Sequence, residues 1–548
     1  MTCSLPQEEG KRRRMHPSGK IRLEGVFPVC HAVLGVERWN QLMTECGDNP
    51  GPEALVQAFI SHQGKLGVPE FLSELARLEL VINEAADENR AIPPEVDHPD
   101  VNPTVHLLDL TWRNLYLFVS PEHGPSSIAP EPGDERILVW RHPKTGDVMV
   151  NPATDQELLV LKMIFEGIEP EDVAVQGGLP VGAVDQALRR AADMGLILAP
   201  RSRIRRDGDD FPRGEIRDEA FLESPFFTIQ WHVTQACDLH CRHCYDRSER
   251  SPLRLDQGIG ILEDLRAFCR DRHVMGQVSF SGGNPLLYPH FLDLYRAASD
   301  RGFVIAILGN PASKETIGAL CAIQRPAFYQ VSLEGLKEHN DYIRGPGTFD
   351  RAIEFLSVLR DFDIPSQVML TLTRDNIDQV LPLAEMLRDH AGSFNFNRLS
   401  QVGEGADLHL PTNDEYAAFL HRYVEAAKDN PVMGLKDNLI NIIRYQQGEE
   451  PFGGCAGYGC SAAFNFVAVL PDGEVHACRK FPSLIGNIFE NSLAEIYDSD
   501  IARRYRSGTK ACRSCPIRPV CGGCLAVVHG QGLDIFEDRD PYCFMGTV

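Results

Sequence analysis

The stretch Cys237-Asp238-Leu239-His240-Cys241-Arg242-His243-Cys244 decides the fold, because it carries three cysteines in the spacing C-x3-C-x2-C. A cubane iron–sulfur cluster normally takes four thiolate ligands. Three thiolates from one short loop therefore leave one iron open to a ligand from outside the protein. The alternative for clustered cysteines is a zinc site, which usually shows two C-x2-C pairs rather than a single triplet. The spacing predicts an iron–sulfur centre with an open coordination position.

Strand and helix patterns alternate along the chain from this triplet onward. Six short apolar segments, each followed by turn residues and a helical pattern, are predicted to be strands: Phe226–Val233, Gln277–Ser281, Phe303–Leu308, Phe328–Leu333, Gln367–Thr373 and Phe394–Leu399. Strands that alternate with helices form a parallel sheet. The first strand delivers the cysteine triplet at its carboxyl end. The sequence therefore predicts an α/β fold with its chemistry at the carboxyl ends of the strands.

The triplet and this layout resemble the radical S-adenosylmethionine (SAM) superfamily. The resemblance implies a partial (β/α)6 barrel over residues 222–410, in which Cys237, Cys241 and Cys244 hold a catalytic [4Fe-4S] cluster. In that superfamily SAM chelates the open iron, an electron enters its sulfonium group, and a 5'-deoxyadenosyl radical results. Tyr245 directly follows the third cysteine, so the resemblance places it near the adenine of SAM.

Further motifs follow the predicted strands where the superfamily contacts SAM. Gly282-Gly283-Asn284-Pro285 resembles the Gly-Gly-Glu-Pro motif that holds the amino group of SAM, with Asn284 in place of the acid. An amide oxygen accepts a hydrogen bond but carries no charge, so we expect SAM binding to survive with altered strength. The other SAM-binding residues that the resemblance implies are Gly282, Gly283, Pro285, Asn310, Ser332, Glu334 and Arg344. Arg344 suits a carboxylate because its planar fork can donate two parallel hydrogen bonds.

Eight cysteines in the C-terminal third form a second constellation. They are Cys455, Cys460, Cys478, Cys512, Cys515, Cys521, Cys524 and Cys543. The pattern resembles the SPASM extension of radical SAM peptide and protein maturases, expected over residues 411–548, although the spacing from Cys521 to Cys524 is one residue shorter than is usual. By family analogy Cys455, Cys460, Cys478 and Cys524 ligate one auxiliary [4Fe-4S] cluster, and Cys512, Cys515, Cys521 and Cys543 ligate the other. The expected cofactors are SAM and three [4Fe-4S] clusters.

A small domain is predicted ahead of the barrel, over residues 104–208. Residues 137–150 are predicted to form a hairpin, three helices follow, and the combination resembles the winged-helix, PqqD-like domain that recognises precursor peptides. Such a domain binds a leader segment by adding it as a strand to an exposed sheet edge. The same pattern also serves DNA binding and plain scaffolding. Residues 1–103 are predicted to be helical, and residues 97–103 within them to be a linker.

Composition and charge narrow the classes of function. The 548 residues carry a formal net charge of -23, which disfavours nonspecific binding to nucleic acid. The sequence shows neither an apolar signal core nor an apolar run of membrane-spanning length, so we expect a cytoplasmic protein with no membrane and no nucleic-acid partner. The basic clusters Lys11–Arg14 and Arg201–Arg206 are expected to be solvated or to lie at a linker. Cys269 and Cys321 lie in helical apolar patterns and are expected to be buried.

The whole arrangement looks most like the selenobiotic-type peptide maturases. That resemblance predicts that a precursor peptide is captured by its leader, that the radical removes hydrogen from a core residue, and that Cys or selenocysteine forms a thioether or selenoether crosslink. An external electron donor such as flavodoxin or ferredoxin is expected. The alternatives are carbon–carbon crosslinking and oxidation of Cys or Ser to formylglycine, although Cys478-Arg479 lacks the acid usual for that oxidation. A non-catalytic iron–sulfur electron carrier or peptide-binding scaffold is the alternative of another class, because Asn284 replaces an acid.

Overall fold

The computed structural model describes residues 23–546, apart from residues 48–49, 63–66, 88, 121–128, 207 and 209–210. The chain divides into two compact units, one of residues 1–179 and 184–201 and the other of residues 180–183 and 202–548. Each unit buries its own hydrophobic side chains. Across the described ranges, every helix is too short or too polar to cross a membrane.

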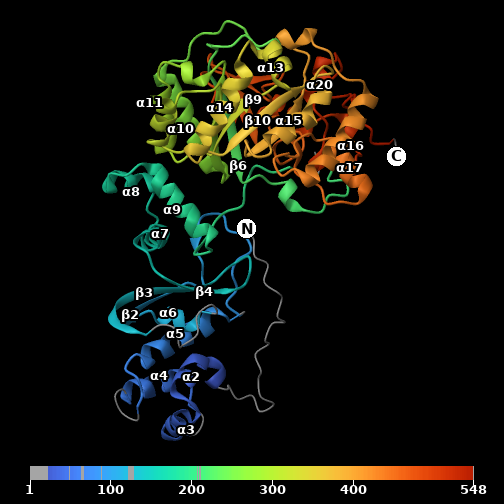
Figure 1. The fold of residues 1–548 in the computed structure, drawn as a ribbon. Helices are drawn as coiled ribbons and strands as arrows, with labels where there is room; N and C mark the ends of the chain where they lie inside the picture. Colours follow the sequence, from blue (N-terminus) through green and yellow to red (C-terminus); the bar gives the residue numbers. More distant parts are fainter. Residues whose placement is uncertain are drawn as a thin grey trace. The chain divides into compact units, whose positions relative to one another are not determined.

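A nine-stranded sheet lies at the centre of the second unit, in the order β11-β10-β9-β8-β7-β6-β12-β13-β14 (Figure 1). Six neighbouring strands in it run parallel. They are β6 (Phe226–Thr234), β7 (Met275–Gly282), β8 (Val304–Leu308), β9 (Phe328–Ser332), β10 (Ser366–Leu372) and β11 (Ser393–Arg398). The six predicted strands and the α/β class are thus confirmed, with strand ends that differ by one or two residues.

Helices connect these parallel strands, as parallel pairing requires. They are α10 (Leu255–Arg272), α11 (Phe291–Asp300), α12 (Lys314–Cys321), α13 (Lys337–Arg344), α14 (Thr348–Asp361) and α15 (Val380–Leu387). Helix α14 buries an apolar stripe of Phe349, Ala352, Phe355, Leu356 and Leu359 at helical spacing. Cys269 is buried on α10 as expected, whereas Cys321 is only partly buried at the end of α12.

The cysteine-rich C-terminal part continues the same sheet. β12 (Phe466–Val469) pairs parallel with β6, and β13 (Glu474–His476) and β14 (Leu484–Asn487) follow in antiparallel order. The helices of this part are α16 (Asn413–Asp429), α17 (Ile440–Gln447), α18 (Leu493–Asp498), α19 (Asp500–Ser507) and α20 (Leu525–Gly530). The β6–β12 pairing was not predicted, and it fixes the C-terminal cysteines against the strand that delivers the cysteine triplet.

The first unit combines helices with a three-stranded antiparallel sheet of order β2-β3-β4. Its strands are β2 (His106–Arg113), β3 (Glu131–Arg141) and β4 (Val148–Pro152), so the predicted hairpin is present as β3–β4. Five helices precede the sheet: α1 (Leu23–Val26), α2 (Pro28–Leu34), α3 (Val36–Glu45), α4 (Pro52–Ser61) and α5 (Leu72–Ala85). Helix α6 (Leu115–Val119) follows β2. Three helices follow β4: α7 (Asp155–Glu166), α8 (Pro170–Gly177) and α9 (Val181–Asp193). Helices α1 to α5 share one hydrophobic core with β2 and β3.

The predicted linker at residues 97–103 is wrong for its second half. Residues Asp100–Val101 form β1, which pairs antiparallel with β5 (Ile197–Leu198). The next residue, Asn102, is buried, and its side-chain amide donates hydrogen bonds to the carbonyl oxygens of Arg141 at 2.9 Å and Gly195 at 2.7 Å. A buried amide with satisfied donors holds the segment in place, although its Pro and Asp content is typical of an exposed connection.

Candidate active site

The cysteine triplet lies in the loop that follows β6. Cys237 is exposed, and Cys241 and Cys244 are half-buried. Burial raises the pKa of the Cys241 thiol, and the neighbouring thiols of Cys237 and Cys244 raise it further, while Arg344 lowers it. Three thiolates this close repel one another, so the arrangement fits a bound cationic iron–sulfur core that compensates their charge.

The Gly-Gly-Asn-Pro turn after β7 packs against the backbone of the cysteine loop. A Cβ atom on Gly282, whose φ is +122°, would lie 2.2 Å from the carbonyl oxygen of Thr234. A Cβ atom on Gly283 would lie 2.2 Å from the carbonyl oxygen of Ala236, which also accepts the Asn284 N–H at 2.7 Å. Only glycine allows so close an approach. The turn therefore holds its backbone beside the triplet, where the resemblance to the superfamily places the SAM amino group.

Asp238, which lies inside the triplet, is a site residue that the sequence reasoning missed. Its Oδ1 accepts a hydrogen bond from the Asn284 side-chain amide at 3.0 Å and from the Asn310 side-chain amide at 2.6 Å. The Asn310 oxygen in turn accepts from Arg344 at 3.2 Å. The structure thus places a carboxylate directly beside the amide that replaces the acid of the Gly-Gly-Glu-Pro motif.

Three expected SAM contacts line one small cavity of about 10 Å³ at the carboxyl end of the barrel. Asn310, Ser332 and Arg344 come from the ends of β8, β9 and α13, and Asp238 lies with them. Arg344 is held by Glu334, whose Oε1 is 3.3 Å from the guanidinium and whose side chain is 2% exposed. Glu334 therefore contacts the arginine rather than the open cavity. Its other oxygen accepts the backbone N–H of Thr371 at 2.8 Å.

Tyr245 and Pro285 take up positions with less direct access to this cavity. The Tyr245 hydroxyl lies 2.8 Å from Nε2 of His232 on β6. Burial raises the pKa of Tyr245 and lowers the pKa of His232 to about 3, so the pair is neutral. Pro285 is buried at the start of the short turn after Asn284. The ring of Tyr245 thus lies next to the cysteine loop, with its hydroxyl turned to β6.

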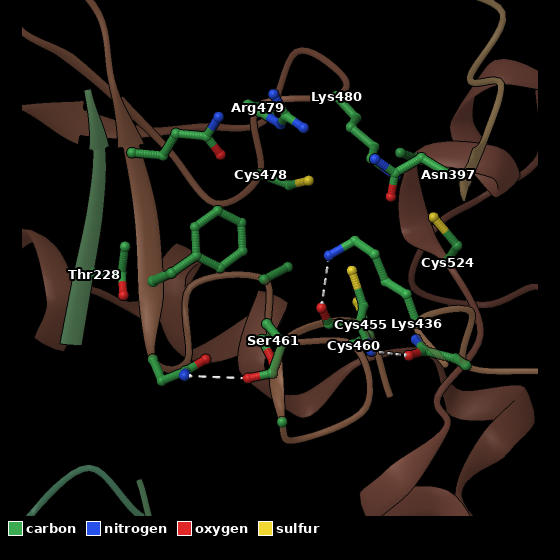
Figure 2. A pocket seen from close by; sticks show the side chains of 18 of the residues that line it. Thr228, Asn397, Lys436, Cys455, Cys460, Ser461, Cys478, Arg479, Lys480 and Cys524 are labelled. Carbon is green, nitrogen blue, oxygen red and sulfur yellow. Dashed lines mark hydrogen bonds between the residues drawn. The ribbon is translucent and has the colours of Figure 1, made fainter. Parts of the chain in front are cut away.

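Four of the C-terminal cysteines meet at a cavity of about 580 Å³. Figure 2 shows the thiols of Cys455, Cys460, Cys478 and Cys524 around one space, with Lys436 and Lys480 beside them. Burial raises the pKa of Cys460 to about 11 and that of Cys478 to about 12. These four residues are the set that family analogy assigns to one auxiliary cluster.

The other four C-terminal cysteines line a separate cavity of about 130 Å³. They are Cys512, Cys515, Cys521 and Cys543. Burial raises the pKa of the Cys512 thiol to about 12, and the thiols of Cys515 and Cys543 add to the shift. Within the described ranges, no three His, Cys, Asp or Glu side chains are placed to hold a single metal ion. Cluster ligands bind different irons, so they need no such convergence on one point.

A buried ion cluster joins the barrel to both sets of auxiliary cysteines. Arg398 at the end of β11 contacts Asp437 at 2.7 Å and both carboxylate oxygens of Asp540 at 2.8 and 2.7 Å. Asp540 also accepts the backbone N–H of Cys524 at 2.8 Å, and its carbonyl oxygen accepts the N–H of Cys543 at 2.9 Å. Asp540 therefore orients one ligand of each expected auxiliary cluster, as outer contacts commonly do around metal ligands.

The expectation that the Arg201–Arg206 cluster is solvated or at a linker is wrong for Arg206. This side chain is buried, and its guanidinium donates to the carbonyl oxygens of Tyr458 and Cys460, each at 2.9 Å. The rings of Phe211 and Phe464 cover it at 4.0 and 4.3 Å. The local sequence around Arg206 does not predict this burial, because the two carbonyl oxygens that accept its hydrogen bonds lie more than 250 residues away in the sequence. The other cluster, Lys11–Arg14, lies outside the described residues.

Comparison with known proteins agrees with this geometry. Residues 231–387 match the radical SAM superfamily, and residues 460–516 match the SPASM family, described as an iron-sulfur cluster-binding domain. The first match includes the cysteine triplet and every expected SAM contact. The second includes Cys460, Cys478, Cys512 and Cys515, while the remaining four auxiliary cysteines lie beyond its ends.

Curated relatives cover more than half of this chain. The AdoMet-dependent heme synthase of Methanosarcina barkeri is 28% identical over 342 residues, which are 58% of this chain and 95% of that protein. Mycofactocin maturase MftC of Mycolicibacterium smegmatis is 29% identical over 355 residues, 61% of this chain and 86% of that protein. AlbA of Bacillus subtilis, an antilisterial bacteriocin subtilosin biosynthesis protein, is 26% identical over 310 residues, 54% of this chain and 66% of that protein.

Among solved structures, Streptococcus suis SuiB is similar with a TM-score of 0.48 and 16% identity, over 75% of this chain and 96% of that chain. The two family matches, with the cysteines and cavities described above, establish the domain content of the second unit. The chain carries a radical SAM domain followed by a SPASM iron–sulfur domain, and it is a radical SAM enzyme that uses SAM and iron–sulfur clusters.

Proposed function

We propose that this enzyme is a maturase of a ribosomally synthesised peptide. The observation that carries the proposal is the arrangement of two cavities around the barrel. One, with Asn310, Ser332 and Arg344, adjoins the cysteine triplet, and the other runs from the barrel interior to four auxiliary thiols. Two of the relatives named above are a maturase and a bacteriocin biosynthesis protein, which supports a peptide rather than a free metabolite.

Most of the predicted site residues have a role in this proposal. Cys237, Cys241 and Cys244 hold the cluster that, with SAM, supplies the 5'-deoxyadenosyl radical for hydrogen abstraction. The Gly282-Gly283 backbone and Asp238 receive the amino group of SAM, and Arg344 receives its carboxylate. Glu334 fixes the arginine, and Ser332 and Asn310 complete the cavity. The auxiliary thiols hold the two further clusters.

The barrel interior offers side chains that suit a peptide backbone. Gln230 on β6, Gln277 on β7, Gln330 on β9 and Gln367 on β10 all line the large cavity. Each carboxamide both donates and accepts hydrogen bonds, which is the pairing that peptide groups require. We infer that the core segment of the substrate enters here, between the triplet and the auxiliary thiols.

The first unit is proposed to bind the leader at the free edge of β4. In the β3–β4 register, Leu138 opposes Asn151 and Trp140 opposes Met149. Because Ala153 N–H donates to the Arg136 carbonyl, these are the hydrogen-bonded pairs, and the amides of Val148 and Val150 face away from β3. The opposite edge, on β2, is partly taken, since Glu74 accepts the N–H of Thr111 at 2.8 Å.

The finer chemistry proposed is a thioether or selenoether crosslink from Cys or selenocysteine of the peptide. Soft sulfur and selenium donors suit iron–sulfur clusters, so an auxiliary cluster that releases one protein thiolate would hold such a side chain near the radical carbon. The cluster would also take up the electron that is left over when the carbon radical and the thiolate form their bond. A flavodoxin or ferredoxin is the proposed source of electrons. Formylglycine formation is less favoured because Arg479, a cation, follows Cys478 at the position of the expected base.

The test is anaerobic co-expression with the short Cys-rich peptide encoded nearest this gene, followed by mass spectrometry after reduction and alkylation. Loss of two hydrogens per site, with a sulfur that no longer alkylates, is expected. An unmodified peptide from protein that cleaves SAM would refute the crosslinking chemistry.

The leader site is tested separately by Val150→Pro, because proline removes an outward N–H without breaking the β3 pairing. It should weaken leader binding at least tenfold, whereas the control Val150→Ala, which keeps the N–H, should not. Equal leader affinity in the two variants would rule out the β4 edge.

A further inference from the structure

Three cations line the large cavity beside the auxiliary thiols. They are Lys436, Arg479 and Lys480, and all three are half-buried. In the part of the chain that the structure describes, none of them forms an ion pair with a carboxylate; Lys436 donates to the Cys455 carbonyl oxygen at 3.0 Å. Half-buried cations without an anionic partner are costly, so the cavity is built to receive negative charge.

The auxiliary cluster itself accounts for only part of that charge. A cubane with four thiolate ligands is a dianion in its oxidised state. Lys436 and Lys480 lie beside the four thiols (Figure 2). Two lysines would match the two negative charges of the dianion, so Arg479 is a third cation beyond that balance.

Arg479 is the cation of this cavity whose charge also acts on the side of the cysteine triplet. It lines the cavity next to Cys478, and after burial it is the charge that contributes most to the low pKa of His232, the residue that contacts Tyr245 behind the cysteine triplet. Gln230, 8% exposed, lines the same cavity, and its side-chain Nε2 is buried without an acceptor. A cationic fork and an unused amide donor therefore share the space where a substrate would lie.

We propose that Arg479, assisted by Gln230, binds a carboxylate of the substrate and so positions it between the two cluster sites. The guanidinium fork matches a carboxylate with two parallel hydrogen bonds, which neither lysine can offer. The inference rests on the proposed function, because in a peptide the carboxylate belongs either to an acidic side chain or to the C-terminus. The substrate class is thus a peptide with a carboxylate close to the modified residue.

The experiment uses the holoenzyme with oxidised clusters, the state for which the charge balance is drawn, and two pairs of small probes. N-acetylglutamate N-methylamide is compared with the neutral N-acetylglutamine N-methylamide, and N-acetylalanine with N-acetylalaninamide. Affinity is measured by calorimetric titration of each probe into the holoenzyme. A hydrogen bond to a charged group corresponds to roughly ten- to hundredfold in affinity, so one charged probe should bind at least tenfold better than its neutral partner. A preference within the glutamate pair identifies a side-chain carboxylate, and a preference within the alanine pair identifies a C-terminal carboxylate.

Variants decide whether Arg479 is responsible. Arg479→Gln should abolish the preference, and Arg479→Lys should retain only about threefold of it because the fork is lost. Arg296→Gln is the matched control, since Arg296 is an exposed arginine on α11, and it should keep the full preference. A preference that persists in Arg479→Gln, or no preference in the wild type, would overturn the inference. The inference would also be overturned if Arg479→Gln changed the reduction potential of the auxiliary cluster but left the carboxylate preference intact.

SAM cleavage by the same preparation after reduction separates this inference from the proposed function. Formation of 5'-deoxyadenosine without carboxylate preference defeats only the role of Arg479. Absence of SAM cleavage in fully loaded enzyme defeats the proposed function, whatever the probes show.

Discussion

Moving one negative charge within the SAM site is the sharpest perturbation that the structure suggests. Asp238 and Asn284 are joined by a 3.0 Å hydrogen bond, so the acid on one side chain and the amide on the other can be exchanged with little change in shape. Asp238→Asn removes the carboxylate that accepts hydrogen bonds from both Asn284 and Asn310. The double variant Asp238→Asn with Asn284→Asp returns the acid to the turn.

The expected magnitude follows from the loss of a charge-assisted hydrogen bond to the ammonium of SAM. Such bonds are worth about 1.5–3 kcal/mol, and the exposed position of Asp238 points to the lower end. Asp238→Asn should therefore weaken SAM binding roughly tenfold, and the double variant should recover to within about threefold of the wild type.

Equilibrium binding of labelled SAM, together with the KM for SAM in 5'-deoxyadenosine formation, measures both effects. Asp300→Asn, an exposed carboxylate at the end of α11, is the control that should change neither. Unchanged SAM affinity in Asp238→Asn, or a double variant no better than the single one, would refute the assignment of the charge to Asp238.

Three further predictions test other parts of the structure. Arg344→Lys should raise the KM for SAM about tenfold or more, because lysine cannot hold Glu334 and Asn310 while also meeting a carboxylate. The pKa of His232 is about 3 in the folded protein and 6.5 in the unfolded chain, so only the unfolded chain takes up a proton at this residue as the pH falls below 6.5. The free energy of unfolding therefore decreases as the pH falls through that range. From pH 7.5 to 5.5 that loss is about 1.4 kcal/mol, and His232→Gln should show a correspondingly smaller fall in Tm. Asp540→Asn should cost about 1.5–3 kcal/mol, because Arg398, 3% exposed, loses its charge-assisted hydrogen bonds to Asp540 and keeps only Asp437 as a carboxylate partner. Asp361→Asn at an exposed pair should cost below about 1 kcal/mol, and equal Tm values for these two variants would contradict the role of the buried cluster.

Local patterns made much of the second unit predictable. The cysteine spacing is contained in eight consecutive residues, and each of the six parallel strands is a short apolar run before a helix. Strand β12 was missed because Phe466–Val469 is short and its partner β6 lies more than 200 residues away. No local pattern encodes so distant a pairing.

The polar contacts of the site depended even more on tertiary structure. The role of Asp238 exists only because the turn at Asn284 packs onto the cysteine loop, and Arg206 is buried only because the rings of Phe211 and Phe464 cover it. In the sequence both appear as ordinary surface charges. Cysteine ligands are recognisable because few other roles require such spacing, whereas a single charged residue has many roles.

The most direct test of the central claim is the formation of 5'-deoxyadenosine from SAM by the anaerobically reduced protein. We predict the product in the wild type and none when Cys237, Cys241 and Cys244 are all replaced by alanine, while the iron held by the eight C-terminal cysteines remains. Product that persists in the triple variant, or no product from wild-type protein with all its clusters, would contradict the account.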